Sequence, residues 1–107
     1  MIRQISATEL RNRLEAAEDA PFLLDVREPQ EFAYCRIDGS VSIPLGELPR
    51  RAHELPPGRE IVAICHHGMR SLQAAAFLQR TFALDVANLH GGVAGWARDV
   101  DPSMKQY

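Results

Sequence analysis

The sequence predicts an α/β fold with three layers, α/β/α, in which helices cover both faces of a central, mostly parallel five-stranded sheet. Short apolar runs alternate along the whole chain with amphipathic stretches, and this rhythm of strand and helix is typical of parallel sheets. The apolar runs are too short to cross a membrane. The chain has 107 residues, enough for one core but not for two, so we expect a single domain over residues 1–107.

The first elements are a strand and a helix. A brief apolar start around Ile5 is followed by "SATE", residues 6–9. This is a capping-box sequence, in which Ser6 and Glu9 satisfy backbone N–H groups at a helix start. The helix that it predicts carries apolar residues at spacings of four and three, namely Leu10, Leu14 and Ala17.

The next segments predict two strands, separated and followed by short helices. "PFLLDV", residues 21–26, is typical of a buried strand, and Pro29 suits the first turn of a short helix that ends near residue 34. A second short strand is expected over residues 41–43. Residues 45–55 are expected to be helical in their middle and to end at "PPG".

The second half contains the clearest periodicity. "EIVAIC", residues 60–65, predicts a buried strand, and residues 70–80 have a broad apolar face at helical spacing. "DVANL", residues 85–89, is expected to be the fifth strand. It is followed by "HGGVAGW" and by a polar tail laid over the surface, in which Tyr107 is a candidate for a fixed side chain.

This order predicts where a site lies. In parallel sheets, ligands bind at the edge formed by the carboxyl ends of the strands. The residues that follow the predicted strands are Arg27, Pro44, His66 with His67, and His90 with Gly91. Arginines, histidines and the cysteine at position 65 are therefore expected at one edge of the sheet.

Cys65 stands between a strand and a helix, which is a favourable place for a thiolate. The positive end of a helix dipole and unpaired backbone N–H groups both stabilise negative charge there. Such surroundings lower the pKa of a cysteine from about 8.5 to below about 7.5. Gly68 permits a tight turn whose N–H groups form an anion-binding nest, and Arg70 adds a cation. Because a cation is unfavourable at a helix start, Arg70 indicates an anionic partner.

These residues bear a resemblance to a known family. "CHHGMRS" resembles the active-site loop of the rhodanese family of sulfurtransferases. "LLDVREPQEF" is similar to the second strand and following helix of that family, and "RIDGSVSIPLGEL" to its central segment. "ANLHGGVAGW" is similar to its last strand and Gly-Gly-x-x-x-Trp turn. The matching segments occur in the family's order over nearly the whole chain, which implies a rhodanese-like fold.

The resemblance also implies a reaction. Cys65 would take sulfane sulfur from a small anionic donor, such as thiosulfate or a persulfide, and pass it to a thiol, a cyanide-like molecule or a protein acceptor. Arg70 would hold the anionic donor or acceptor, and Ser71 would fix the loop at the helix start. The outer sulfur of the persulfide would be surrounded by the backbone N–H groups of His66, His67, Gly68, Met69 and Arg70.

Two other functions are weighed against this one. A sulfur-carrier or protein-interaction module would form the persulfide but turn over little by itself. A phosphatase of the related dual-specificity type would carry Cys-x5-Arg, whereas Cys65 to Arg70 inclusive is six residues, Cys-x4-Arg. The shorter loop fits one sulfur atom better than a tetrahedral phosphate, and it lacks a carboxylate to protonate a leaving group.

Further residues are candidates for a supporting role. Asp25 is expected to anchor a neighbouring loop by hydrogen bonds. Arg27 has two interpretations, contact with an anion or an ion pair with Glu28 or Glu31. Arg36 replaces the family's usual His, which affects the entry route or local packing. The adjacent Cys35 is interpreted as structural rather than as a second reactive thiol.

Composition limits the remaining classes. The net charge of -2 and pI near 6.0 offer no general attraction to nucleic acid or to a membrane surface. We expect no metal at His66 and His67, because adjacent side chains should diverge and no second ligand pair has metal spacing. No cofactor is implied. Two cysteines without a CxxC pair, and an N-terminus without an apolar leader, favour a reducing compartment, the cytoplasm.

Overall fold

The computed structural model describes residues 1–16 and 18–107, and its strands form one five-stranded sheet. The strands lie in the order β1-β5-β4-β2-β3, and every pairing is parallel. The predicted fold class is therefore confirmed. The five strands are β1 (Arg3–Ile5), β2 (Phe22–Asp25), β3 (Val41–Ser42), β4 (Ile61–Ile64) and β5 (Val86–Leu89).

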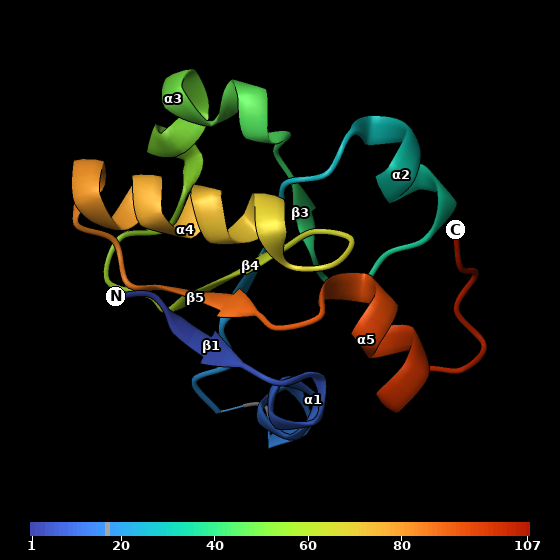
Figure 1. Ribbon diagram of the computed structural model, residues 1–107. Coiled ribbons are helices and arrows are strands. Elements are labelled where there is room, and N and C mark those ends of the chain that lie inside the picture. The colour runs from blue at the N-terminus through green and yellow to red at the C-terminus, as the bar shows by residue number, and fades with distance from the viewer. Residues whose placement is uncertain (17) are drawn as a thin grey trace.

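Helices lie on both faces of this sheet (Figure 1). On one face are α1 (Ala7–Ala16) and α5 (Gly92–Asp99), and on the other are α3 (Leu48–Arg51) and the long α4 (Met69–Phe82). The short α2 (Pro29–Tyr34) lies near the carboxyl ends of the strands, beside the C-terminal tail (Figure 1). The sheet edge that should hold the site is thus framed by α2, α5 and the tail.

The side chains of β4 alternate between the two cores. Ile61, Ala63 and Cys65 pack into the core that also contains buried residues of α4, whereas Val62 and Ile64 belong to the opposite core. This alternation follows from the two-residue period of a strand. It places Cys65 on the α4 face of the sheet, at the point where the chain leaves β4.

Most predicted elements are present. The capping box of α1 is formed, with Ser6 N–H donating to Glu9 over 3.2 Å and Glu9 N–H donating to the Ser6 hydroxyl over 3.1 Å. The predicted helix at 70–80 extends over Met69–Phe82. Residues 45–55 form three short helical pieces, η1 (Leu45–Glu47), α3 and η2 (Ala52–Glu54). The predicted apolar position Ala17 lies outside the described residues.

The helix α5 was not expected from the sequence. Glycines disfavour helices in isolation, and the helix has two of them, Gly92 and Gly95. Its buried residues nevertheless include Val93, Trp96 and Ala97, spaced so that they share one face. Burial of this face against the sheet stabilises the helix despite the low propensity of its glycines.

In the part of the chain that the structure describes, no helix is both long and apolar enough to cross a membrane. That residues 1–107 act as one domain stays a prediction.

Candidate active site

The sulfur of Cys65 lies at the carboxyl end of β4 and receives hydrogen bonds from the loop that follows it. Gly68 N–H donates to Cys65 Sγ over 3.0 Å, and the Ser71 hydroxyl lies 3.3 Å from the same atom. The backbone N–H groups of His67 and Ser71 also favour negative charge on this sulfur. We call residues 65–71 the Cys65 loop. Cys65 is 1% exposed, so these donors meet its sulfur in a site that excludes most water.

Two glycines allow the Cys65 loop to adopt this shape. Gly68 has φ of 107°, a left-handed conformation that glycine adopts without strain, and it caps the N-terminus of α4. Gly92, at the start of α5, has φ of 58°, and a Cβ there would lie 2.3 Å from the carbonyl oxygen of Cys65. This close approach lets Val93 N–H donate to the Cys65 carbonyl and Ala94 N–H to the His66 carbonyl. The first turn of α5 therefore holds the Cys65 loop from behind.

The hydrogen bonds determine the charge state of Cys65. Burial by itself raises the pKa of the thiol, but the Ser71 hydroxyl and the backbone N–H groups of Ser71, Gly68 and His67 outweigh it. The net result is a pKa below the ordinary value for cysteine. The direction agrees with the expectation from the helix start, and the cause is a set of specific hydrogen bonds.

Asn88, on β5, ties the Cys65 loop to the sheet. It is 2% exposed, and its Nδ2 donates to the Gly68 carbonyl over 3.1 Å and to Gln4 Oε1 over 3.0 Å. Its Oδ1 accepts a short hydrogen bond from the Ser71 hydroxyl. One side chain therefore contacts both Gly68 and Ser71, whose N–H group and hydroxyl group lie within hydrogen-bond distance of the sulfur of Cys65.

Arg70 has an anionic partner within the protein. Its guanidinium donates to both carboxylate oxygens of Glu31 on α2, over 2.7 and 2.9 Å. The hydrogen bonds from Arg70 lower the pKa of Glu31 to about 2. The Arg70 side chain is still 37% exposed, so one side of it remains open to a further anion. The carboxylate of Glu31 thus compensates the positive charge of Arg70, which is unfavourable at the start of α4.

The predicted partner of Arg27 was wrong. Arg27 is fully buried and forms a bidentate ion pair with Asp25, with Nη2 2.7 Å from Oδ2 and Nε 2.9 Å from Oδ1. Burial disfavours its charge, but hydrogen bonds to Asp25 and Tyr107 raise its pKa above the usual value. Asp25 also accepts from the backbone N–H of Arg27 over 3.0 Å, so it anchors the loop after β2, as expected, as well as the Arg27 side chain. Arg27 in turn holds the Cys35 carbonyl over 2.7 Å and so fixes the end of α2.

Tyr107 fastens the tail over this region. Its hydroxyl accepts from Arg27 over 2.9 Å and donates to Glu31 over 2.8 Å. Its ring stacks on His66, with the ring centroids 3.9 Å apart. The imidazoles of His66 and His67 also lie 3.9 Å apart, which corrects the expectation that they diverge. Burial and the charge of His67 lower the pKa of His66, so this ring is neutral at physiological pH.

Two further sequence candidates have surroundings of their own. Arg36 donates to the Phe32 carbonyl over 3.2 Å and lines a cavity with Trp96 and Asp38, and its supporting role stays a prediction. Met69 is 72% exposed at the first turn of α4. Among the described residues, no group of three His, Cys, Asp or Glu side chains is arranged to hold a metal ion.

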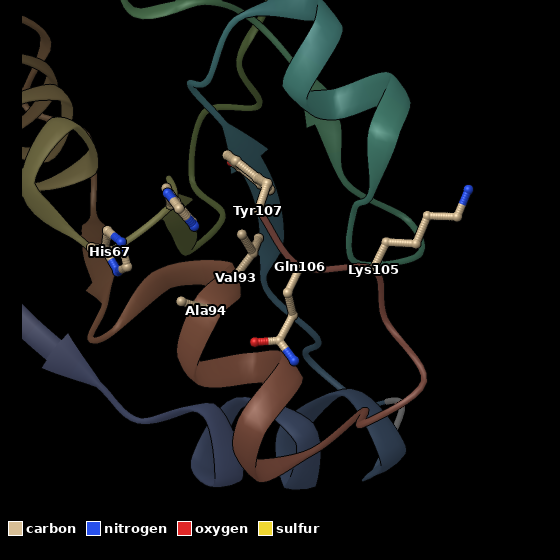
Figure 2. Close-up of a pocket in the computed structure, with 7 residues that line it drawn as sticks. His67, Val93, Ala94, Lys105, Gln106 and Tyr107 are labelled. Atoms are coloured by element: carbon tan, nitrogen blue, oxygen red, sulfur yellow. The ribbon is translucent and has the colours of Figure 1, made fainter.

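A cavity of about 130 Å³ lies beside the Cys65 loop. Figure 2 shows His67 on one side of it and Tyr107 on the other, with Val93 and Ala94 of α5 between them. The lining is completed by His66, Lys105 and Gln106, and the Lys105 side chain points away from the cavity (Figure 2). Cys65 does not line this cavity. The cavity therefore lies beside the Cys65 loop and is not the pocket in which Cys65 would react.

Three residues of the site were not given their roles from the sequence. Glu31 was considered only as a partner for Arg27, and Tyr107 only as a fixed tail residue. Asn88 was not considered, although a polar residue inside the apolar segment "VANL" is a usable signal, since a buried amide needs partners. Their pairing depends on contacts between segments far apart in the chain.

Fold and site together define a class of protein: a parallel α/β domain with a hydrogen-bonded cysteine at a strand end. The family model for the Rhodanese-like domain matches residues 6–99, so the chain belongs to the rhodanese-like family. A sulfurtransferase of Allochromatium vinosum is 38% identical over 98 residues, which cover 92% of this chain and 91% of that protein. The identification of a sulfurtransferase family from the sequence is thereby confirmed.

Two further relatives are informative. A putative sulfur carrier protein of Bacillus subtilis is 38% identical over 95 residues, which cover 89% of this chain and 51% of that protein. The crystal structure of a rhodanese-related protein from Thermoplasma volcanium has a TM-score of 0.83 and 33% identity, covering 92% of this chain and 93% of that one. The relatives thus include both a sulfurtransferase and a putative carrier.

Proposed function

We propose that this protein is a sulfurtransferase that carries sulfane sulfur as a persulfide on Cys65. The observation that carries the proposal is the set of N–H and O–H donors converging on the Cys65 sulfur, with Gly68 N–H at 3.0 Å. A lowered pKa increases the fraction of thiolate at neutral pH, and the thiolate is the nucleophilic form of cysteine. A compartment that keeps thiols reduced, such as the cytoplasm, suits this chemistry.

The reaction has two steps. With thiosulfate as donor, the Cys65 thiolate attacks the outer sulfur, a new S–S bond forms, and sulfite leaves with the electrons of the broken S–S bond. The persulfide anion then holds the terminal sulfur. In the second step an acceptor thiolate attacks that sulfur, leaves as a persulfide anion, and restores the Cys65 thiolate.

The surrounding residues support each step. The backbone N–H groups of the Cys65 loop stabilise the negative charge of the thiolate and then of the terminal sulfur. The exposed side of Arg70 binds the anionic donor, while Glu31 holds the guanidinium in place. Because both oxygens of Glu31 are already hydrogen-bonded to Arg70, the donor binds an oriented cation and needs no further ordering of its side chain.

Intact-mass analysis tests the proposal. After incubation with thiosulfate or a small persulfide, the wild-type chain should gain the mass of one sulfur, and the C65S variant should not. The matched control is C35S, which removes the other cysteine and should leave the adduct in place. Absence of any adduct on the wild type with every donor tried, or an adduct that survives in C65S, would refute the proposal.

A carrier role with little turnover is the second candidate, favoured by the 1% exposure of Cys65 and by the putative carrier among the relatives. Single-turnover transfer separates the two candidates. The pre-formed persulfide should pass its sulfur to small thiols at a rate matching steady-state turnover if the protein is an enzyme. Loss of the sulfur only to a protein acceptor would select the carrier. Hydrolysis of an aryl phosphate that depends on Cys65 would instead favour the phosphatase.

A further inference from the structure

The hydroxyl of Ser71 faces two acceptors but carries one proton. Cys65 Sγ lies 3.3 Å from Ser71 Oγ, and Asn88 Oδ1 is at short hydrogen-bond distance on the other side. A serine hydroxyl donates a single hydrogen bond at a time. The sulfur and the amide oxygen therefore compete for the same proton.

Whether the two atoms compete depends on which end of the Asn88 amide, Oδ1 or Nδ2, faces Ser71. A flipped amide would present an N–H to Ser71 and leave the hydroxyl proton free for the sulfur. The opposite end of the amide faces the Gly68 carbonyl over 3.1 Å, and a backbone carbonyl can only accept. Nδ2 must therefore point to Gly68 and Oδ1 to Ser71. The 2% exposure of Asn88 leaves little water to replace either partner.

We propose that Asn88 is a positioning residue that limits the negative charge on Cys65 by holding the hydroxyl proton of Ser71 away from the sulfur. In the thiol form, Cys65 S–H donates to Ser71 Oγ and Ser71 donates to Asn88 Oδ1. In the thiolate form, the hydroxyl turns toward the sulfur and leaves two acceptor oxygens facing each other. The amide thus weakens the stabilisation that the Ser71 hydroxyl gives to the thiolate, while the N–H groups of the loop favour the thiolate.

Asn88 also acts in the opposite direction through its other end. By holding the Gly68 carbonyl, Nδ2 keeps the Gly68 N–H aimed at the sulfur, 3.0 Å away. Replacement of the whole side chain therefore changes two things at once. A double-mutant cycle with Ser71 separates them, because only the competition for the proton requires the serine hydroxyl.

The inference rests on the proposed role of Cys65 as the nucleophile, but its test needs no sulfur donor. The thiolate of Cys65 is titrated by its ultraviolet absorbance in the wild type, N88A, S71A and the double variant. Matching proteins that also carry C65S subtract Cys35 and the tyrosines. Thermal unfolding followed by circular dichroism verifies that each variant is folded.

The expected result is a coupling between the two positions. The effect of N88A on the pKa of Cys65 is measured twice, once with Ser71 present and once in the S71A background. The shift with Ser71 present should be lower than the other by about 0.5–1 unit, which is the size expected for one redirected hydrogen bond. Equal shifts in both backgrounds would overturn the inference. Should N88A not fold, S71A alone still decides, because a hydroxyl proton held by Asn88 adds little to the stability of the thiolate. A rise in the pKa of Cys65 of about 0.3 unit or less supports the inference, and a larger rise refutes it. A normal titration without persulfide formation would refute only the proposed function.

Discussion

Replacing Glu31 by Gln removes the carboxylate that holds Arg70 and keeps the size of the side chain. The hydrogen bonds from Arg70 lower the pKa of Glu31 from 4.5 to about 2. A shift of this size corresponds to at most about 3 kcal/mol of stabilisation of the charged form. The Arg70 side chain is 37% exposed and the Glu31 side chain 18%, so solvent screening reduces this gain. We therefore expect E31Q to lose about 1–2 kcal/mol of unfolding free energy at pH 7.

The pH dependence follows from the direction of the shift. Because the pKa of Glu31 is lower in the folded state, its contribution is complete above pH 4.5 and is lost as the pH falls toward 2. The E31Q variant has no carboxylate to protonate at this position. The difference in stability between wild type and E31Q should therefore shrink over that pH range.

Urea unfolding of both proteins at a series of pH values measures this difference. The matched control is E15Q, at an exposed position on α1, which should stay close to the wild type throughout. Taking the difference between two proteins cancels the other carboxylates whose pKa is lowered, such as Glu54 and Asp99. A gap between wild type and E31Q that stays constant from pH 7 to about pH 2, or no gap at pH 7, would refute the assignment of an ion pair to Glu31 and Arg70.

Two further predictions concern the groups around the Cys65 loop. Y107F removes the hydroxyl that joins Arg27 to Glu31 but keeps the ring on His66, and it should cost about 1 kcal/mol in urea unfolding. An unchanged midpoint would mean that the tail is not held by this hydroxyl. G92A places a Cβ 2.3 Å from the Cys65 carbonyl at φ of 58°, so it should lower stability by roughly 3 kcal/mol or prevent folding. Thermal unfolding checks this, with G46A, where a Cβ meets open space, as the tolerated control.

The sequence was sufficient for elements whose signals are local. The capping box at Ser6 and the apolar run of β4 each lie within a few residues, and both were placed correctly. The position of Cys65 at the carboxyl end of a parallel strand followed from the order of elements alone. A helix rich in glycine was missed, because α5 is stabilised by burial and by the carbonyl groups of another loop, which propensity does not include.

The partners of the charged residues were harder to predict. Arg70 and Glu31 are 39 positions apart, and Tyr107 is 76 positions from Glu31. For Arg27 the sequence suggested an anion or the nearby Glu28 or Glu31, whereas its side chain pairs with Asp25, the last residue of β2. Because Arg27 lies in the bend after this strand, the two-residue strand period does not by itself predict the pair. Pairs between residues far apart in the sequence can be predicted only when the fold that brings them together is known.

The two buried cysteines have different electrostatic surroundings. Cys35 is 9% exposed, and its sulfur lies 3.8 Å from the Arg27 guanidinium. That cation is already matched by the carboxylate of Asp25, so a thiolate at Cys35 would add a second negative charge to a neutral buried pair. The Cys65 sulfur instead faces backbone N–H groups, which bring no counter-charge with them. Negative charge on Cys65, or on a sulfur bound to it, would therefore be stabilised by donors that no carboxylate already occupies. This difference supports the proposal of Cys65, and not Cys35, as the nucleophile.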